Sequence, residues 1–182
     1  SQAIAQSCAS RDDAYLLYHT VYLAAVQYTL PQSFLTKDQL HKIEKKSLSR
    51  MVSKCGYNSK TSRAILFGPV EMGGGGFLPL YSIAGTGYIK HFLQLWRTPW
   101  EDAGKLLRTV LAWSQFQAGI SSPILQHPEI EISYMEGRFI SQIRLYLTSI
   151  QGRIHLQEDY VPKPLRTNDI MIMDLIKTDE FT

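Results

Sequence analysis

The sequence predicts a mainly α-helical protein: a bundle of five or six helices with at most a short strand pair. Apolar residues recur every three to four positions over several long segments, which is the spacing of a helix face. Residues that favour helix starts and ends bound these segments. Alternation typical of a strand is confined to Arg153–Gln157. With 182 residues, the chain is long enough for one domain with a sizeable core or for two small helical units.

The first long predicted helix covers Arg11–Leu30. Ser10 is suited to cap its start, because a serine oxygen accepts hydrogen bonds from the first free amides of a helix. The carboxylates of Asp12 and Asp13 favour the positive end of the helix dipole. We expect the helix to end before Pro31, because the residue that precedes a proline disfavours helical backbone.

Segment 14–36 contains no charged residue, which raises the question of a membrane span. Pro31 cuts the segment to about 17 residues, near the lower limit for crossing a bilayer. We therefore interpret it as a buried core helix and expect no membrane association. Cys8 and Cys55 form no disulfide framework and no metal-binding spacing, so a reduced, intracellular setting (nuclear or cytoplasmic) is expected.

A second helix is predicted over Lys37–Lys54. Thr36 and Gln39 form the pattern of a capping box at its start, and Gly56 is suited to end it. The helix is amphipathic. On a helical wheel, one side collects Leu40, Ile43, Met51 and Cys55, and the opposite side collects Lys42, Lys45, Lys46 and Arg50.

Positive charge is concentrated in segment 37–63, where eight lysines and arginines stand against Asp38 and Glu44. The whole chain has a formal net charge of only +3, so the other segments are acidic on balance. Such asymmetry favours a polyanion partner, although a solvated helix face has the same pattern. The candidate nucleic-acid contacts are Lys42, Lys45, Lys46, Arg50, Lys54, Lys60 and Arg63.

A glycine-rich segment follows the basic helix, and we predict that it is a structural turn that lets two helices approach. Its turn residues are Gly68, Pro69, Gly73, Gly74, Gly75 and Gly76. A phosphate-binding P-loop would continue with Lys and Ser or Thr, whereas Gly76 is followed by Phe77-Leu78-Pro79. The dinucleotide-binding pattern fails at its third glycine. Nucleotide binding through this loop is therefore the less favoured interpretation.

Two further helices are predicted after the glycines. Pro79 suits the first position of a helix that continues to Arg97. Thr98-Pro99-Trp100-Glu101 combines a capping residue, a proline at the first helical position and a glutamate at the third, so it predicts the next helix start. That helix is expected to reach Ala118 and to end at Gly119.

The last third of the chain has weaker signals. A loop is predicted over Ser121–Pro128, followed by a helix over Tyr134–Gln151 that Gly152 closes. Arg153–Gln157 alternates and is a candidate short strand. Asp169–Lys177 is compatible with a helix or a buried strand, and the start signal at its beginning favours a helix.

Catalytic and metal-binding motifs are not evident. The five histidines are scattered, without the spacing of a zinc site. No serine lies in a Gly-x-Ser-x-Gly elbow. Asp12 and Asp13 open a helical pattern, whereas a polymerase pair of metal-binding aspartates lies at a tight turn between strands. We expect no metal and no cofactor in this chain.

The serial order of several short motifs resembles the region after the palm in reverse transcriptases of non-LTR (LINE-like) retroelements. The likeness covers about residues 15–152. Its motifs are Tyr28-x-Leu30-Pro31, Cys55-Gly56-Tyr57-Asn58, Gly68-Pro69, Gly73-Gly74-x-Gly76-Phe77, Leu80-Tyr81, Ile89-x-x-Phe92-Leu93, Leu95-x-Arg97-Thr98, Trp113-x-Gln115 and Gly119-x-Ser121-x-Pro123-Ile124-Leu125. Position 84 departs from the pattern, with alanine where the family has glutamine.

The resemblance implies that this chain is the thumb and connector of an RNA-directed DNA polymerase. Residues 1–62 would be a thumb-like helical unit with a basic second helix, and residues 63–182 the glycine-rich turn and a helical connector. Its partners would be an RNA–DNA or DNA duplex and a polymerase palm upstream in a longer protein. Because the palm carries the metal-binding aspartates, the chain would not be catalytic alone.

A helical protein-interaction module without a nucleic-acid role is the alternative function. The tryptophans bear on this choice, because Trp96, Trp100 and Trp113 lie near basic residues in the sequence. Aromatic side chains beside cations are suited to stacking on bases. Aromatic residues at helical spacing are also typical of a core, and the sequence leaves both interpretations open.

Overall fold

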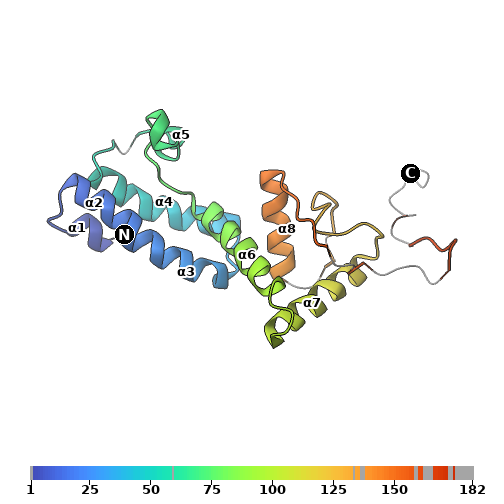
Figure 1. Cartoon of the computed structure of the whole chain (residues 1–182). Coiled ribbons are helices and arrows are strands. Elements are labelled where there is room, and N and C mark those ends of the chain that lie inside the picture. Colours follow the sequence, from blue (N-terminus) through green and yellow to red (C-terminus); the bar gives the residue numbers. More distant parts are fainter. Residues whose placement is uncertain are drawn as a thin grey trace. The chain divides into compact units, whose positions relative to one another are not determined.

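The computed structural model of the chain is mainly helical, which confirms the predicted fold class (Figure 1). It describes residues 2–58, 60–132, 134–135, 138–157, 160–161, 166–171 and 174, and no strand occurs among them. The chain divides into two compact units, Ser1–Gly87 and Tyr88–Thr182. The glycine-rich turn belongs to the first unit, whereas the sequence had suggested a boundary after residue 62.

The first unit contains most of the short elements. In chain order they are α1 (Gln2–Gln6), α2 (Arg11–Leu17), the π-helical segment η1 (Tyr18–Tyr22), α3 (Leu23–Ser33), α4 (Lys37–Lys54), α5 (Arg63–Leu66), the 3-10 segment η2 (Val70–Met72) and the first half of α6 (Leu80–Trp96). α1 and α2 both pack against α4. The basic helix α4 is therefore the element against which the N-terminal helices α1 and α2 pack.

The helix predicted over Arg11–Leu30 is interrupted and longer than expected. A π-helical segment separates α2 from α3, and α3 continues through Pro31 to Ser33. A proline inside a helix removes one backbone donor and its ring crowds the preceding turn, so other contacts must compensate for it. The Pro31 ring packs closely against Gly87 of α6. The contact is so close that a Cβ atom added to Gly87 would lie only 2.3 Å from Cγ of Pro31. This contact with α6 explains why the helix passes the proline.

α4 has the predicted bounds and the predicted capping box. The amide of Gln39 donates to Oγ1 of Thr36 at 3.3 Å, and the amide of Thr36 donates to Oε1 of Gln39 at 2.9 Å. Gly56 follows the helix with φ of +84°, the left-handed conformation that glycine adopts without strain. One face was wrongly predicted: Ile43 is 45% exposed, and Glu44 takes the inward position instead.

An aromatic core lies between the first helices and the glycine segment. Tyr18 and Phe77 are almost fully buried, with ring centroids 4.7 Å apart. The amide of Leu78 donates to the Tyr18 hydroxyl, and burial raises the pKa of Tyr18 to about 12. The hydroxyl of Tyr15 donates to the carbonyl of Gly75. These two tyrosines therefore hold the glycine segment against the first helices.

The glycine run is a close-packed turn. Gly73 and Gly76 have positive φ. Gly74 and Gly75 are required for a different reason, because a side chain at either position would clash with the neighbouring backbone. A Cβ atom on Gly74 would lie 2.2 Å from the carbonyl oxygen of Gly68. On Gly75, a Cβ atom would lie 2.8 Å from the carbonyl oxygen of Leu66. The run therefore folds directly against the end of α5.

The second unit contains the rest of α6, α7 (Asp102–Ala118) and α8 (Arg138–Ile150). α6 begins at Leu80, one residue after the predicted first position at Pro79, and α7 begins at Asp102, three residues later than its start signal suggested. The reason is that the hydroxyl of Thr98 donates backwards to the Leu95 carbonyl, so this residue serves the end of α6. α7 ends at Gly119, with φ of +64°, as predicted.

The last predicted elements are partly wrong. Tyr134 and Met135 are not helical, because the Tyr134 hydroxyl donates to the Ala118 carbonyl and holds this residue at the end of α7. After α8, the left-handed residue is Gln151, with φ of +54°, rather than Gly152. The predicted strand over 153–157 is irregular in the structure, and the Ile154 amide in this segment donates to the Leu125 carbonyl.

Residues 169–171, where the last helix was predicted to start, are irregular; Asp174 is helical, and residues 172–173 and 175–177 lie outside the described residues. The carboxylate of Asp169 accepts a hydrogen bond from the Arg166 amide. This bond forms a local turn, which competes with a helix at the same position.

Two buried polar side chains hold the loop that follows α7. The side-chain amide of Gln115 donates to the carbonyls of Ile120 and Ser122 and accepts from the Ile124 amide. The guanidinium of Arg144 donates to the Ile124 carbonyl, and burial lowers the pKa of this group. Because buried polar groups need partners, these bonds fix the loop to the core of the unit.

Candidate nucleic-acid interface

The basic side chains of α4 lie on its solvent face, as the amphipathic pattern predicted. Lys42, Lys45, Lys46 and Arg50 are all exposed, and the inward side of the helix is formed by Leu40, Glu44, Leu48, Met51 and Val52. Beyond the helix, Lys60 and Arg63 are exposed and Lys54 is half-buried. We call Lys42, Lys45, Lys46, Arg50, Lys60 and Arg63 the basic surface.

Few negative charges oppose this surface. Of the two acids in α4, Asp38 lies in the first turn and Glu44 is only 3% exposed. Within the described residues, no ion pair involves Lys42, Lys45, Lys46 or Arg50. Their positive charges are therefore not neutralised by neighbouring carboxylates and create a positive potential at the surface. A polyanion in solution would meet four unpaired cations on one helix.

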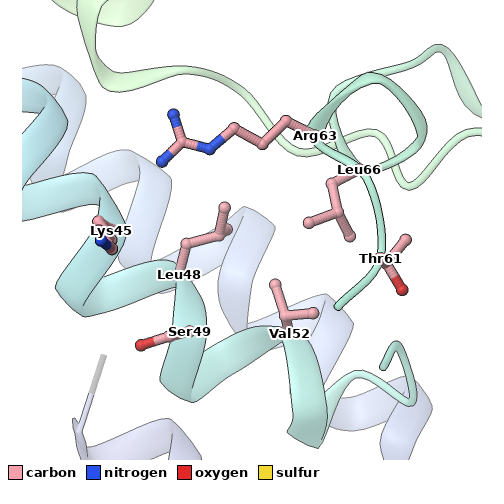
Figure 2. A pocket seen from close by; sticks show the side chains of 7 residues that line it. All are labelled: Lys45, Leu48, Ser49, Val52, Thr61, Arg63 and Leu66. Carbon is pink, nitrogen blue, oxygen red and sulfur yellow. The ribbon is translucent and has the colours of Figure 1, made fainter. Parts of the chain in front are cut away.

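A recess of about 240 Å³ opens beside this helix, between α4 and α5 (Figure 2). Leu48 and Val52 of α4 face Leu66 of α5 across it, and the Arg63 side chain extends over the same space. Lys45, Ser49 and Thr61 complete the lining. The recess thus combines an apolar floor with two cations at its edge.

Glu44 links the basic surface to the start of α6. Its Oε2 accepts a hydrogen bond of 2.9 Å from the Leu80 amide, and its Oε1 lies 3.9 Å from Nη1 of Arg63. The buried carboxylate therefore satisfies a free amide at a helix start and attracts the guanidinium towards the recess. The sequence contained a signal for this role, because Glu44 is spaced with Leu40 and Leu48 on the inward side.

Replacing Glu44 by leucine is expected to destabilise the chain by about 2 kcal/mol, because the buried Leu80 amide loses its acceptor. Glu44→Gln keeps a carbonyl oxygen at the same place and is expected to lose less than half of that. Urea denaturation followed by circular dichroism measures both changes. Equal stability of Glu44→Leu and wild type would show that this hydrogen bond has no structural importance.

The glycine turn is not arranged as a phosphate cradle. A phosphate site needs free backbone amides. Here the amides of residues 73–77 all donate to backbone carbonyls of the preceding segment, which are those of Val70, Pro69, Ile65, Gly68 and Leu66. The geometry favours the predicted structural turn at Gly68, Pro69 and Gly73–Gly76.

The other features considered in the sequence, which are the aspartate pair, a metal site and a membrane span, provide no further candidate site among the described residues. The hydroxyl of Ser10 accepts from the Asp13 amide, so Ser10 is the predicted helix cap and Asp12 and Asp13 lie in the first turn of α2. Within the described part of the chain, no three His, Cys, Asp or Glu side chains gather in a way that would hold a metal ion. None of the described helices is long and apolar enough to span a membrane.

The recess was not predicted from the sequence. Val52 and Leu66 carry ordinary core signals, and nothing in their spacing shows that the segment after α4 returns alongside it. In the structure, Arg63 and Lys45 line the same recess although they lie eighteen positions apart in the sequence. The sequence indicated only that both residues are basic.

Comparisons with protein-family models, with curated proteins and with solved structures found no match to this chain. A function must therefore be inferred from the basic surface, the recess beside it and the motifs in the sequence.

Proposed function

We propose that the chain is the thumb and connector region of an RNA-directed DNA polymerase from a non-LTR retroelement. In this role the first unit holds the template–primer duplex by its backbone, and the basic surface on α4 makes the contact. The duplex is an RNA–DNA hybrid or DNA, and the palm that carries the catalytic metals belongs to another part of the polymerase. The proposal places the protein inside the cell, in the nucleus or cytoplasm.

The unpaired cations of α4 are the single observation that carries this proposal. Lys42, Lys45 and Lys46 lie within two turns of the helix and are exposed, while the neighbouring Glu44 is buried. Lysine and arginine side chains that neutralise phosphates supply the sequence-independent part of nucleic-acid affinity. A thumb must slide along any template, so contacts without base information suit this task.

Binding to two RNA–DNA hybrids of unrelated sequence tests the proposal. Fluorescence anisotropy with the full chain is expected to give dissociation constants that agree within about threefold, because phosphate contacts do not read sequence. Absence of binding to either hybrid at low salt would contradict the proposal. A strong preference for one sequence would also contradict it, since that requires contacts to base edges.

The purified chain is expected not to extend a primer by itself in the presence of Mg²⁺ or Mn²⁺. Two-metal catalysis requires carboxylates that hold both ions close to the primer end. Asp12 and Asp13, the one adjacent pair of aspartates, lie in the first turn of a helix. Incorporation that persists in an Asp12→Asn/Asp13→Asn variant would mean that the chain has a catalytic site elsewhere.

A helical protein-interaction module is the second candidate, and one observation favours it. Leu106, Trp113 and Phe116 of α7 lie at helical spacing and are each more than half exposed. Exposed apolar stripes of this kind are typical of surfaces that dock onto another protein. This candidate takes precedence if the chain binds neither hybrid.

A further inference from the structure

The recess between α4 and α5 has a composition that a simple phosphate site would not need. Leu48, Val52 and Leu66 form its floor, and each is less than one-tenth exposed. A phosphate gains nothing from apolar carbon and loses hydration beside it. The small part of these side chains that remains open suits an occupant that presents a small apolar group next to its charge.

Cations flank this apolar floor. Lys45 lies at one side, and Arg63 extends over the recess from the start of α5 (Figure 2). Glu44 lies 3.9 Å from the Arg63 guanidinium, and Arg63 makes no hydrogen bond through its side chain among the described residues. Its donors thus remain open for an anionic ligand while the buried carboxylate favours its position.

We propose that this recess holds one sugar ring of the nucleic-acid backbone, with Lys45 and Arg63 on the phosphates at either side of it. This inference rests on the proposed function and adds a defined subsite to it. A sugar ring presents carbon-bound hydrogens to the leucine and valine side chains, and its phosphates reach the two cations. Every nucleotide has this combination of groups, so the subsite is compatible with binding to any sequence.

The size of the recess agrees with a single ring. Its volume is about 240 Å³, whereas pockets that enclose whole small molecules measure about 300–1,000 Å³. One sugar ring in the recess leaves its base free to remain stacked in the duplex.

Nuclear magnetic resonance of the full chain with a short RNA–DNA hybrid tests the subsite. We expect the methyl signals of Leu48, Val52 and Leu66 to shift on titration and to show contacts to sugar protons of the hybrid. Shifts of lysine and arginine signals without any change at these methyl groups would overturn the sugar subsite and leave the proposed function intact. A chain that does not bind the hybrid at all would overturn both.

A matched pair of variants provides an independent readout. Ser49 lines the recess, and Ser53 lies one turn further along α4, outside the lining; both are exposed. Ser49→Leu fills the recess without removing a charge and is expected to weaken hybrid binding about tenfold, the size of an effect at an interface centre. Ser53→Leu is expected to change binding less than about twofold. Equal effects of the two variants would overturn the subsite.

Discussion

A chain with Gly74→Ala is expected to lose about 3 kcal/mol of stability or to fail to fold. The added Cβ atom would lie 2.2 Å from the carbonyl oxygen of Gly68 and 2.6 Å from its Cα, so two backbone segments must separate. Overpacking typically costs about 1–3 kcal/mol, and rigid backbone atoms place this site at the upper end. The separation would also break the bond from the Gly76 amide to the Gly68 carbonyl.

Gly73→Ala is the matched control, because the same atom meets no neighbour within 4 Å at that position. Its φ of +79° is unfavourable for alanine, so a cost of about 1 kcal/mol is expected. Urea denaturation measures the free energy of unfolding of both variants. The comparison separates the cost of a clash at Gly74 from the cost of an unfavourable backbone conformation at Gly73. If Gly73→Ala proved the more damaging change, the turn would depend on its left-handed residue rather than on its contact with Gly68.

Replacing Lys42, Lys46 and Arg50 together by glutamine is expected to flatten the salt dependence of hybrid binding. Each phosphate neutralised on a duplex contributes about 0.9 to the slope of log K against log salt concentration. Loss of three contacts therefore reduces the slope by about 2 to 3 units. Stability is expected to change by less than about 0.5 kcal/mol, because the three side chains are exposed.

The control removes the same number of charges from the second unit. Lys90, Arg97 and Arg138 are also exposed, and their joint replacement by glutamine is expected to change the slope by less than about one unit. Anisotropy titrations at four or more salt concentrations give both slopes. Equal flattening by the two triple variants would mean that net charge, rather than the basic surface on α4, determines binding.

Local signals explain the parts of the fold that the sequence predicted well. The capping box at Thr36 and Gln39 and the left-handed Gly56 involve residues close in sequence, so their bonds can be recognised without knowledge of the fold. The exposed side of α4 follows from the 3.6-residue period. For the same reason, the basic face of the candidate interface could be predicted residue by residue.

Distant contacts explain the errors. Pro31 remains within α3 because its ring packs against Gly87, and no local rule contains that contact. Glu44 has the spacing of the inward residues Leu40 and Leu48, but its partner, the amide of Leu80, lies 36 positions later and could not be predicted. The recess likewise depends on the return of residues 61–66 alongside α4. Tertiary packing determines such features, and it is not encoded in the spacing of one segment.

The salt dependence of hybrid binding by the unaltered chain tests the central claim most directly. Four cations of α4 stand exposed and unpaired among the described residues. If each neutralises one phosphate, log K falls with log salt concentration with a slope of about −3.5 or steeper. A slope near zero, or no binding at low salt, would contradict the claim that the basic surface grips a nucleic-acid backbone.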